Sequence, residues 1–151
     1  MTDRLTLVGE YVPSAAAWVR DQVAAYEASN GAEANTLRDT GLPVIVVTHR
    51  GAKSMKVRKI ALMRVESGGE YALVASAGGA PSHPSWYGNL IAHPDEVIIQ
   101  DGAHRFRASV REVSGDERAR WWERAVAAYP PYAEYQTRTD RLIPVLVATE
   151  V

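Results

Sequence analysis

Six short apolar runs, separated by reversals that contain glycine or proline, restrict this chain to a fold built on β-strands. The runs are rich in β-branched residues and are roughly three to nine residues long, which is typical of strands. Two reversals, Ser67-Gly68-Gly69 and Asp101-Gly102, favour tight hairpins between antiparallel neighbours. The predicted strands are 43–48, 57–65, 71–76, 97–99, 106–113 and 143–148.

The segment before the first strand predicts an amphipathic helix. Pro13 suits the first turn of a helix and Asn30-Gly31 suits its end. The polar face of this helix is not basic, which favours packing on the core over contact with a membrane. We expect residues 1–35 to form an N-terminal helical extension. The apolar residues at helical spacing are Ala15, Trp18, Val19, Val23 and Tyr26.

Two further helices are expected among the strands. A short one begins near Pro84 and stops before Pro94. A longer one begins at Ser114, where the hydroxyl and a glutamate three residues later, Glu117, form a capping pattern. Pro130-Pro131 ends it, and a helical turn after that break would place three tyrosine rings on one face. The chain is therefore predicted to be an α+β protein.

The turn between the first two strands carries four formal positive charges in nine residues, at Arg50, Lys53, Lys56 and Arg58. Such a turn can bind an anion through its charges and its free backbone N–H groups. A basic turn is also common as plain solvated surface, so the local pattern leaves both interpretations open. The whole chain has 17 Lys+Arg against 18 Asp+Glu, which gives no general attraction to nucleic acid or to an acidic membrane.

Spacing excludes several catalytic motifs. Ala52-Lys53-Ser54 is similar to the end of a P-loop, but Thr48 occupies the place of the first glycine and a strand follows. Ser76 lacks the first glycine of a nucleophile elbow, and there is no Rossmann fingerprint. The chain has no cysteine, and its four histidines lack metal-binding spacing, so we expect no metal. The protein then either binds a ligand or uses a cofactor for its chemistry.

The order of five motifs along residues 40–148 carries a family resemblance. They are Gly51-x-Lys53-Ser54-x-x-x-Arg58, Val74-Ala75-Ser76-x-Gly78-Gly79-Ala80, Pro84-x-Trp86-Tyr87-x-Asn89-Leu90, Tyr129-Pro130-x-Tyr132-x-x-Tyr135-Gln136 and Thr139-Asp140-Arg141-x-Ile143-Pro144. In this order they resemble the deazaflavin-dependent nitroreductases, also described as F420H2-dependent quinone reductases. The resemblance implies a mostly antiparallel split β-barrel of about six strands. It also implies an N-terminal helix, two or three further helices, and a cofactor-binding barrel domain at residues 36–151.

The resemblance also implies roles for the matching residues. The basic turn would hold the phosphate and acidic tail of coenzyme F420, the segment before Ala80 would line its ring, and the tyrosines would face the substrate. Trp86 and Asn89 would hold the short helix against the site or contact the cofactor's linker. The implied cofactor-binding residues are Lys53, Ser54, Lys56, Arg58, Ala75, Ser76, Ala77, Gly78, Gly79, Trp86 and Asn89, and the implied substrate-binding residues are Ser76, Tyr129, Tyr132 and Tyr135.

Two positions depart from the family pattern. Met55 stands where the family usually has glycine, which predicts a different turn, and Lys56 beside it supplies an extra charge. Ala77 stands where many members have lysine, which removes one anion contact.

The expected activity is hydride transfer from reduced F420 to an electron-poor acceptor such as a quinone or a nitroaromatic compound. No run of about 18 apolar residues and no leader is visible, so we expect a cytoplasmic protein with at most peripheral membrane contact. The resemblance implies a monomer, and the balanced charge of the chain predicts no nucleic-acid partner. Two alternatives remain open. One is a non-catalytic protein that binds F420 or a lipid, and the other is a split-barrel protein that uses FMN or haem instead.

Overall fold

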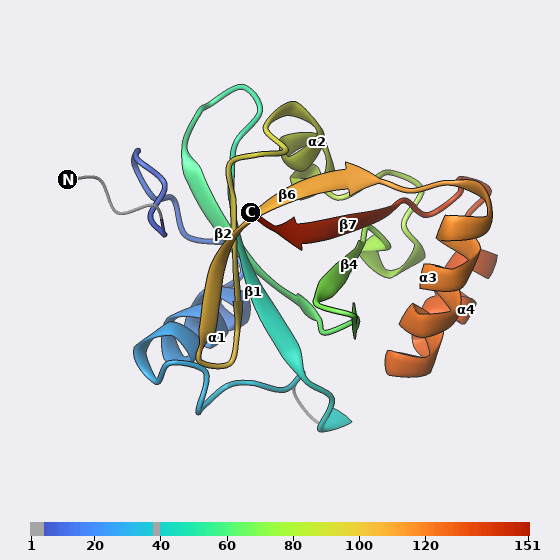
Figure 1. The fold of residues 1–151 in the computed structure, drawn as a ribbon, viewed down its shortest axis with the longest axis horizontal. Coiled ribbons are helices and arrows are strands. Elements are labelled where there is room, and N and C mark those ends of the chain that lie inside the picture. The colour runs from blue at the N-terminus through green and yellow to red at the C-terminus, as the bar shows by residue number, and fades with distance from the viewer. Residues whose placement is uncertain (1–4, 38–39) are drawn as a thin grey trace.

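The strands form one curled antiparallel sheet in the computed structural model, which describes residues 5–37 and 40–151 (Figure 1). Its order is β2-β1-β5-β6-β7-β4-β3. The predicted α+β split-barrel class is confirmed, and the strand beyond the six expected is the two-residue β3. The strands are β1 (Val44–Arg50), β2 (Val57–Met63), β3 (Glu66–Ser67), β4 (Glu70–Val74), β5 (Val97–Asp101), β6 (His104–Glu112) and β7 (Val145–Glu150).

Four helices and one tight turn complete the described fold. Each helix expected from the sequence is present, and the break at Pro130 is followed by a separate short helix, which brings the rings of Tyr129, Tyr132 and Tyr135 together. The elements are α1 (Ala17–Ala28), the 3-10 turn η2 (Ala77–Gly79), α2 (Ser85–Ala92), α3 (Gly115–Ala128) and α4 (Pro131–Thr137).

The predicted capping of α3 is wrong in its chemistry. Ser114 is the residue before the helix, but its hydroxyl makes no capping hydrogen bond. The carboxylate of Glu117 instead accepts two hydrogen bonds from the guanidinium of Arg111 on β6, at 2.8 and 2.7 Å. The Arg111 guanidinium offers this carboxylate two charge-assisted hydrogen bonds, whereas a capping box offers it one from a backbone N–H, so the glutamate turns toward the strand.

Strands β1, β5 and β7 are buried on both faces over most of their length, which explains why they are nearly continuous apolar runs, whereas β6 alternates buried and more exposed residues. On β1, Val44 and Val46 point to one face, and Ile45 and Val47 point to the other. The first face is covered by α1, α3 and α4, and the second by α2.

The N-terminal region is fastened to the sheet at two places. Residues 10–12 pair with the edge strand β2, since Val57 N–H donates to Glu10 O at 2.8 Å and Val12 N–H donates to Val57 O at 2.9 Å. The hydroxyl of Tyr26 on α1 is buried and accepts the N–H of Gly102 in the β5–β6 turn at 2.7 Å. These contacts cover an exposed strand edge and fix α1 beside β2.

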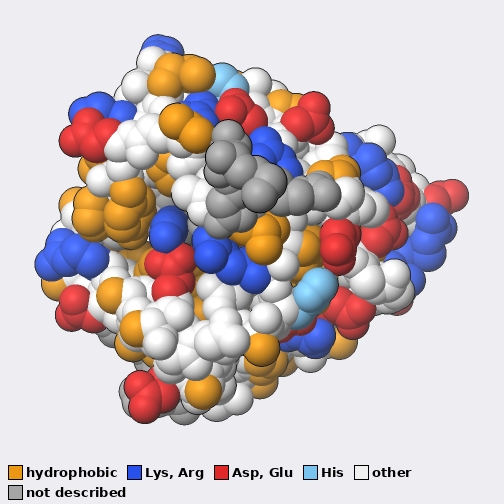
Figure 2. All heavy atoms as spheres, turned by 60° about the vertical axis from the view of Figure 1, so that its left-hand side comes forward, with side chains coloured by type: hydrophobic (Ala, Val, Ile, Leu, Met, Phe, Trp, Pro, Cys, Tyr) orange, Lys and Arg blue, Asp and Glu red, His pale blue; other side chains and the backbone are white. Residues whose placement is uncertain are grey.

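Charges of both signs are mixed on the face shown in Figure 2, where lysine and arginine side chains lie beside aspartate and glutamate. This agrees with the near-zero net charge of the chain. In residues 5–37 and 40–151, no helix combines the length and the apolar character needed to cross a membrane.

Candidate functional site

Three hollows adjoin, because each shares wall residues with the next, and we call the three together the trough. The tyrosine pocket, about 420 Å³, shares Val19, Ile60 and Trp86 with a middle groove of about 270 Å³. The middle groove shares Arg58 and Ser85 with a basic mouth of about 490 Å³ at the turn between β1 and β2. The trough therefore joins the two regions that the sequence singled out, the cationic turn and the tyrosine segment.

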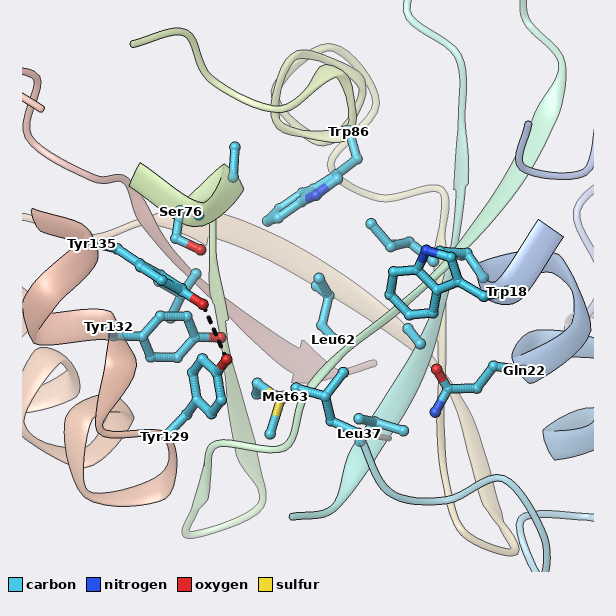
Figure 3. Close-up of a pocket in the computed structure, with 17 residues that line it drawn as sticks. Trp18, Gln22, Leu37, Leu62, Met63, Ser76, Trp86, Tyr129, Tyr132 and Tyr135 are labelled. Atoms are coloured by element: carbon cyan, nitrogen blue, oxygen red, sulfur yellow. Dashed lines mark hydrogen bonds between the residues drawn. The ribbon is translucent and has the colours of Figure 1, made fainter. Parts of the chain in front are cut away.

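Three tyrosines from the end of α3 and from α4 form one wall of the tyrosine pocket, and Ser76 lies above them (Figure 3). The hydroxyls of Tyr129 and Tyr135 are 3.1 Å apart and share a hydrogen bond, and the rings of Tyr129 and Tyr132 meet edge to face at 5.0 Å. That hydrogen bond and burial raise the pKa of Tyr129 to about 12, and burial raises the pKa of Tyr132. Both hydroxyls stay protonated at neutral pH and can donate hydrogen bonds.

The opposite walls of the tyrosine pocket are apolar and aromatic. Trp86 of α2 lies above the pocket, and Leu62 and Met63 of β2 line its floor (Figure 3). Trp18 and Gln22 reach it from α1. A pocket with apolar walls and a few hydroxyls on one side suits a flat, mostly aromatic ligand with polar edges.

The turn after β4 has an unusual backbone. Ala77, Gly78 and Gly79 all have positive φ, at 46°, 65° and 82°. Ala77 and Gly78 line the tyrosine pocket, and open space surrounds Gly78. An alanine in this region costs about 1 kcal/mol relative to glycine, so the rest of the structure must hold the turn in place.

Two residues implied by the resemblance lie away from the pocket. A Cβ on Gly79 would lie 2.6 Å from the carbonyl oxygen of Tyr135, so this glycine permits the close packing of α4. Ala75 is fully buried, and its N–H donates to Pro144 O at 3.0 Å. The structure thus brings Ser76, Ala77 and Gly78 to the pocket, and places Ala75 and Gly79 behind it.

Arg141 supports this turn from behind, and sequence reasoning missed it. Its guanidinium donates to the carbonyl oxygens of Ser76 at 2.7 Å, Ala80 at 2.9 Å and Ala75 at 3.2 Å. It also lies 2.9 Å from Nδ1 of His83. The signal in the sequence was its place in the last matching motif, but nothing local identifies carbonyls about sixty residues away as its partners.

The cations of the basic turn have different partners. Arg50 is buried, donates to Glu96 at 3.0 Å and to Met55 O at 2.7 Å, and so braces the turn. Lys56 pairs with Glu10 at 3.2 Å and does not line the trough. Within the part of the chain that the structure describes, Lys53 and Arg58 are the cations of this turn that have no carboxylate partner, and both line the basic mouth.

The backbone of the basic turn is also specialised. Met55 has a φ of 62°, in the region that favours glycine, and its side chain is half exposed. Met55 therefore takes up a glycine-like conformation, which Arg50 stabilises through the Met55 carbonyl. Ser54 lines the mouth, and its Oγ accepts the N–H of Lys56 at 3.2 Å.

Asn89 connects α2 to the basic turn. Its Oδ1 accepts the N–H of Ala52 at 2.9 Å, and its Nδ2 lies 3.3 Å from Nδ1 of His49 on β1. Asn89 borders the basic mouth, and Trp86 of the same helix separates the tyrosine pocket from the middle groove. His49, which borders the middle groove, was not singled out from the sequence because it is a lone histidine in a strand.

His49 is expected to make the stability of the protein depend on pH below 6.5. Burial, and then the Arg58 guanidinium, lower the pKa of its imidazole from 6.5 to about 4. Between pH 6.5 and about pH 4 the imidazole binds a proton in the unfolded chain but not in the folded protein. The free energy that the neutral imidazole contributes to folding is therefore fully present above pH 6.5 and is lost as the pH falls. Arg58 and Lys59 of β2 are the cations beside it in the groove.

We compare the free energy of unfolding of wild type with that of His49→Gln. When the pH is lowered from 7.5 to 5, we expect this free energy to fall by about 2 kcal/mol more in wild type than in the variant. Urea unfolding of both proteins at each pH measures it. The glutamine variant is the control, because it keeps a polar side chain that does not titrate. Parallel pH profiles for the two proteins would contradict the shifted pKa.

Comparison with known proteins agrees with this geometry. Residues 18–150 match the F420H(2)-dependent quinone reductase family. An F420H(2)-dependent quinone reductase of Mycobacterium tuberculosis is 38% identical over 130 residues, which cover 83% of this chain and 85% of that protein. A solved structure described as an F420-H2 dependent reductase is 56% identical, with a TM-score of 0.67 over 70% of this chain and 93% of the other.

A second solved structure bears on the oligomeric state. It is 49% identical, has a TM-score of 0.69, covers 87% of this chain and 96% of its own, and is described as a domain-swapped dimer. The expectation of a monomer is therefore not supported. The match of the family over most of the chain, together with a trough that joins a cationic turn to a tyrosine pocket, shows that this chain belongs to the F420H(2)-dependent quinone reductase family.

Proposed function

We propose that this protein transfers a hydride from reduced coenzyme F420 to a quinone, or to another electron-poor acceptor such as a nitroaromatic compound. The observation that carries the proposal is the trough, with protonated hydroxyls in an aromatic pocket at one end and, at the other, two cations that have no carboxylate partner in the described part of the chain. The names of the related proteins point to the same cofactor and acceptor class.

The residues present fit the two chemically different ends of the cofactor. Its phosphate and glutamyl tail is a flexible polyanion, which Lys53 and Arg58 can attract and Ser54 can hydrogen-bond. Its ring is flat and largely apolar, which suits the walls formed by Trp86, Leu62 and Met63. The middle groove would then accommodate the chain that links ring and tail.

Bound reduced F420 supplies a hydride from C5 of its deazaflavin ring. The task of the protein is to hold an electron-poor acceptor against that carbon and to stabilise the charge that develops on the acceptor oxygen. The Ser76 hydroxyl borders the pocket and makes no hydrogen bond to any residue that the structure describes. It is therefore available to donate to the acceptor.

The tyrosine pair supplies a second donor. Two hydroxyls that share one hydrogen bond leave one hydrogen free, so either Tyr129 or Tyr135 can donate into the pocket while the other orients it. With the pKa of Tyr129 raised to about 12, this pair is a hydrogen-bond donor at neutral pH and not a base. The proton that completes reduction of the acceptor is then taken from solvent.

The test is acceptor-dependent oxidation of reduced F420 by the purified protein with menadione, followed through the absorbance of the oxidised cofactor. We expect turnover with the acceptor and none without it. Replacing both Tyr129 and Tyr135 by phenylalanine is expected to lower kcat/KM by about tenfold or more, because developing charge loses its donor.

Two results would count against the proposal. Tight F420 binding without oxidation by any of a panel of quinones and nitroimidazoles would point to a storage protein. Binding of FMN in preference to F420, in parallel titrations of the apo-protein, would point to a flavin-dependent split barrel.

A further inference from the structure

The orientation of one side-chain amide fixes the state of a buried histidine. Asn89 Oδ1 faces the N–H of Ala52 at 2.9 Å, and because an N–H can only donate, the atom facing it must be the amide oxygen. The amide nitrogen of Asn89 therefore points to His49 Nδ1, at 3.3 Å. An amide N–H2 is only a donor, so Nδ1 of His49 must be the acceptor.

This contact places the remaining imidazole proton on the other ring nitrogen. A neutral imidazole with Nδ1 as acceptor carries its hydrogen on Nε2. Burial and the nearby Arg58 lower the pKa of His49 to about 4, so the ring is neutral at physiological pH. His49 is therefore a fixed, uncharged N–H donor.

The donor has no partner among the residues that the structure describes. His49 is only 3% exposed, and its Nε2 makes no hydrogen bond to any residue in the described ranges, 5–37 and 40–151. Nε2 is nevertheless not fully enclosed, so it belongs to the small exposed part of the side chain. The surface that this residue borders is the middle groove. A buried polar group in this position calls for a hydrogen-bond acceptor in the groove.

The surroundings define the acceptor. Arg58 borders the same groove and has no carboxylate partner within residues 5–37 and 40–151, whereas Lys59 is neutralised by Glu27 at 2.7 Å. In the part of the chain that the structure describes, no cluster of three or more possible ligands could hold a metal. The guanidinium of Arg58 beside the neutral N–H donor of His49 suits an oxygen-rich organic chain that carries hydroxyls and a phosphate ester.

We propose that His49 donates its Nε2 hydrogen to an oxygen of the polyol-phosphate linker of the deazaflavin cofactor, and so selects for a ligand with that linker. The proposal rests on the proposed function, since it assumes that the ring lies in the tyrosine pocket and the tail at the basic mouth. Asn89 is then a positioning residue, because it sets the tautomer of His49 and also ties α2 to the basic turn.

The first test needs no variant. A long-range ¹H–¹⁵N spectrum of the apo-protein should show His49 as the Nε2–H tautomer at neutral pH. Addition of F420 should shift the Nε2 resonance, and a deazaflavin with only a methyl group at N10 should not. An Nδ1–H tautomer, or an Nε2 resonance that F420 does not move, would overturn the proposal.

The second test compares two substitutions that treat the donor differently. His49→Leu removes it and should weaken F420 binding by about tenfold, whereas His49→Gln supplies an amide N–H donor and should stay within about threefold of wild type. Both should bind the N10-methyl deazaflavin as wild type does. Equal F420 affinity of His49→Leu and wild type would overturn the proposal.

A third ligand, the ribityl deazaflavin that lacks phosphate, identifies the oxygen. If His49→Leu also weakens its binding, the acceptor is a polyol hydroxyl, and if only F420 is affected, it is the phosphate. If wild type did not bind F420, the proposed function would be wrong. The tautomer of His49 would still be measured on the apo-protein, so the two failures can be told apart.

Discussion

Replacing Lys53 and Arg58 together by alanine is expected to weaken F420 binding by about a hundredfold at low salt. Both side chains line the basic mouth, and neither has a carboxylate partner in the described structure. A hydrogen bond to a charged group contributes roughly 1.5 kcal/mol or more, so the loss of two such contacts gives about this factor. Titration of the cofactor's fluorescence against protein, at low and high ionic strength, measures the effect.

Salt should reduce this difference. Lys53 is exposed, so its attraction for the anionic tail is screened at high ionic strength, and Lys53→Ala alone should weaken binding more at low salt than at high salt. Arg58 is half-buried and should be screened less. A dissociation constant that the double substitution leaves unchanged would remove this turn from the site.

Lys56→Ala is the matched control. Lys56 belongs to the same turn and has the same side chain, but it already pairs with Glu10 at 3.2 Å and lies outside the trough. Its loss should change affinity by less than about threefold. If Lys56→Ala and Lys53→Ala weakened binding equally, the affinity would come from the general charge of the turn and not from defined contacts.

This contrast shows how far the sequence could predict the basic turn. The strands on either side, the reversal and the excess of positive charge are local features, and the structure contains them. Which charges are free depends on remote carboxylates, since Glu96 neutralises Arg50 and Glu10 neutralises Lys56. No local pattern discloses those pairings, so the sequence could neither distinguish Lys56 from Lys53 nor predict the bracing role of Arg50.

The glycine pair after β4 shows the same limit of local sequence information. Two adjacent glycines mark a place where the backbone can take up positive φ at little cost, because glycine has no Cβ, and the structure has such a turn there. Gly78 lies open to the pocket, whereas Gly79 is required by the carbonyl of Tyr135, which comes from a helix more than fifty residues later. Sequence could predict the turn, but only packing decides which glycine faces the ligand.

The largest effect on stability is expected at Arg141, which belongs to neither the cofactor set nor the substrate set. Arg141→Ala should lower the free energy of unfolding by about 3 kcal/mol, because three carbonyl oxygens lose a charged donor in a partly buried place. Arg138→Ala is the control, because Arg138 is an exposed arginine that pairs with Glu134 four residues away, and it should cost less than about 0.5 kcal/mol. Urea unfolding measures both.

We expect Arg141→Ala to lower enzymatic activity as well as stability, and a second substitution, Arg141→Lys, tests why. The Ser76 hydroxyl and Gly78 border the pocket only while their turn keeps its left-handed form, which Arg141 holds through the carbonyls on either side. Arg141→Lys keeps the charge, but an ammonium cannot reproduce the planar fork that reaches three carbonyls, so we expect kcat to stay well below wild type. Faster hydrogen exchange at the Gly78 and Gly79 amides in both variants would report the loosened turn directly. Full recovery of kcat and amide protection by lysine would mean that charge alone matters, because the turn would then not depend on the geometry of the guanidinium.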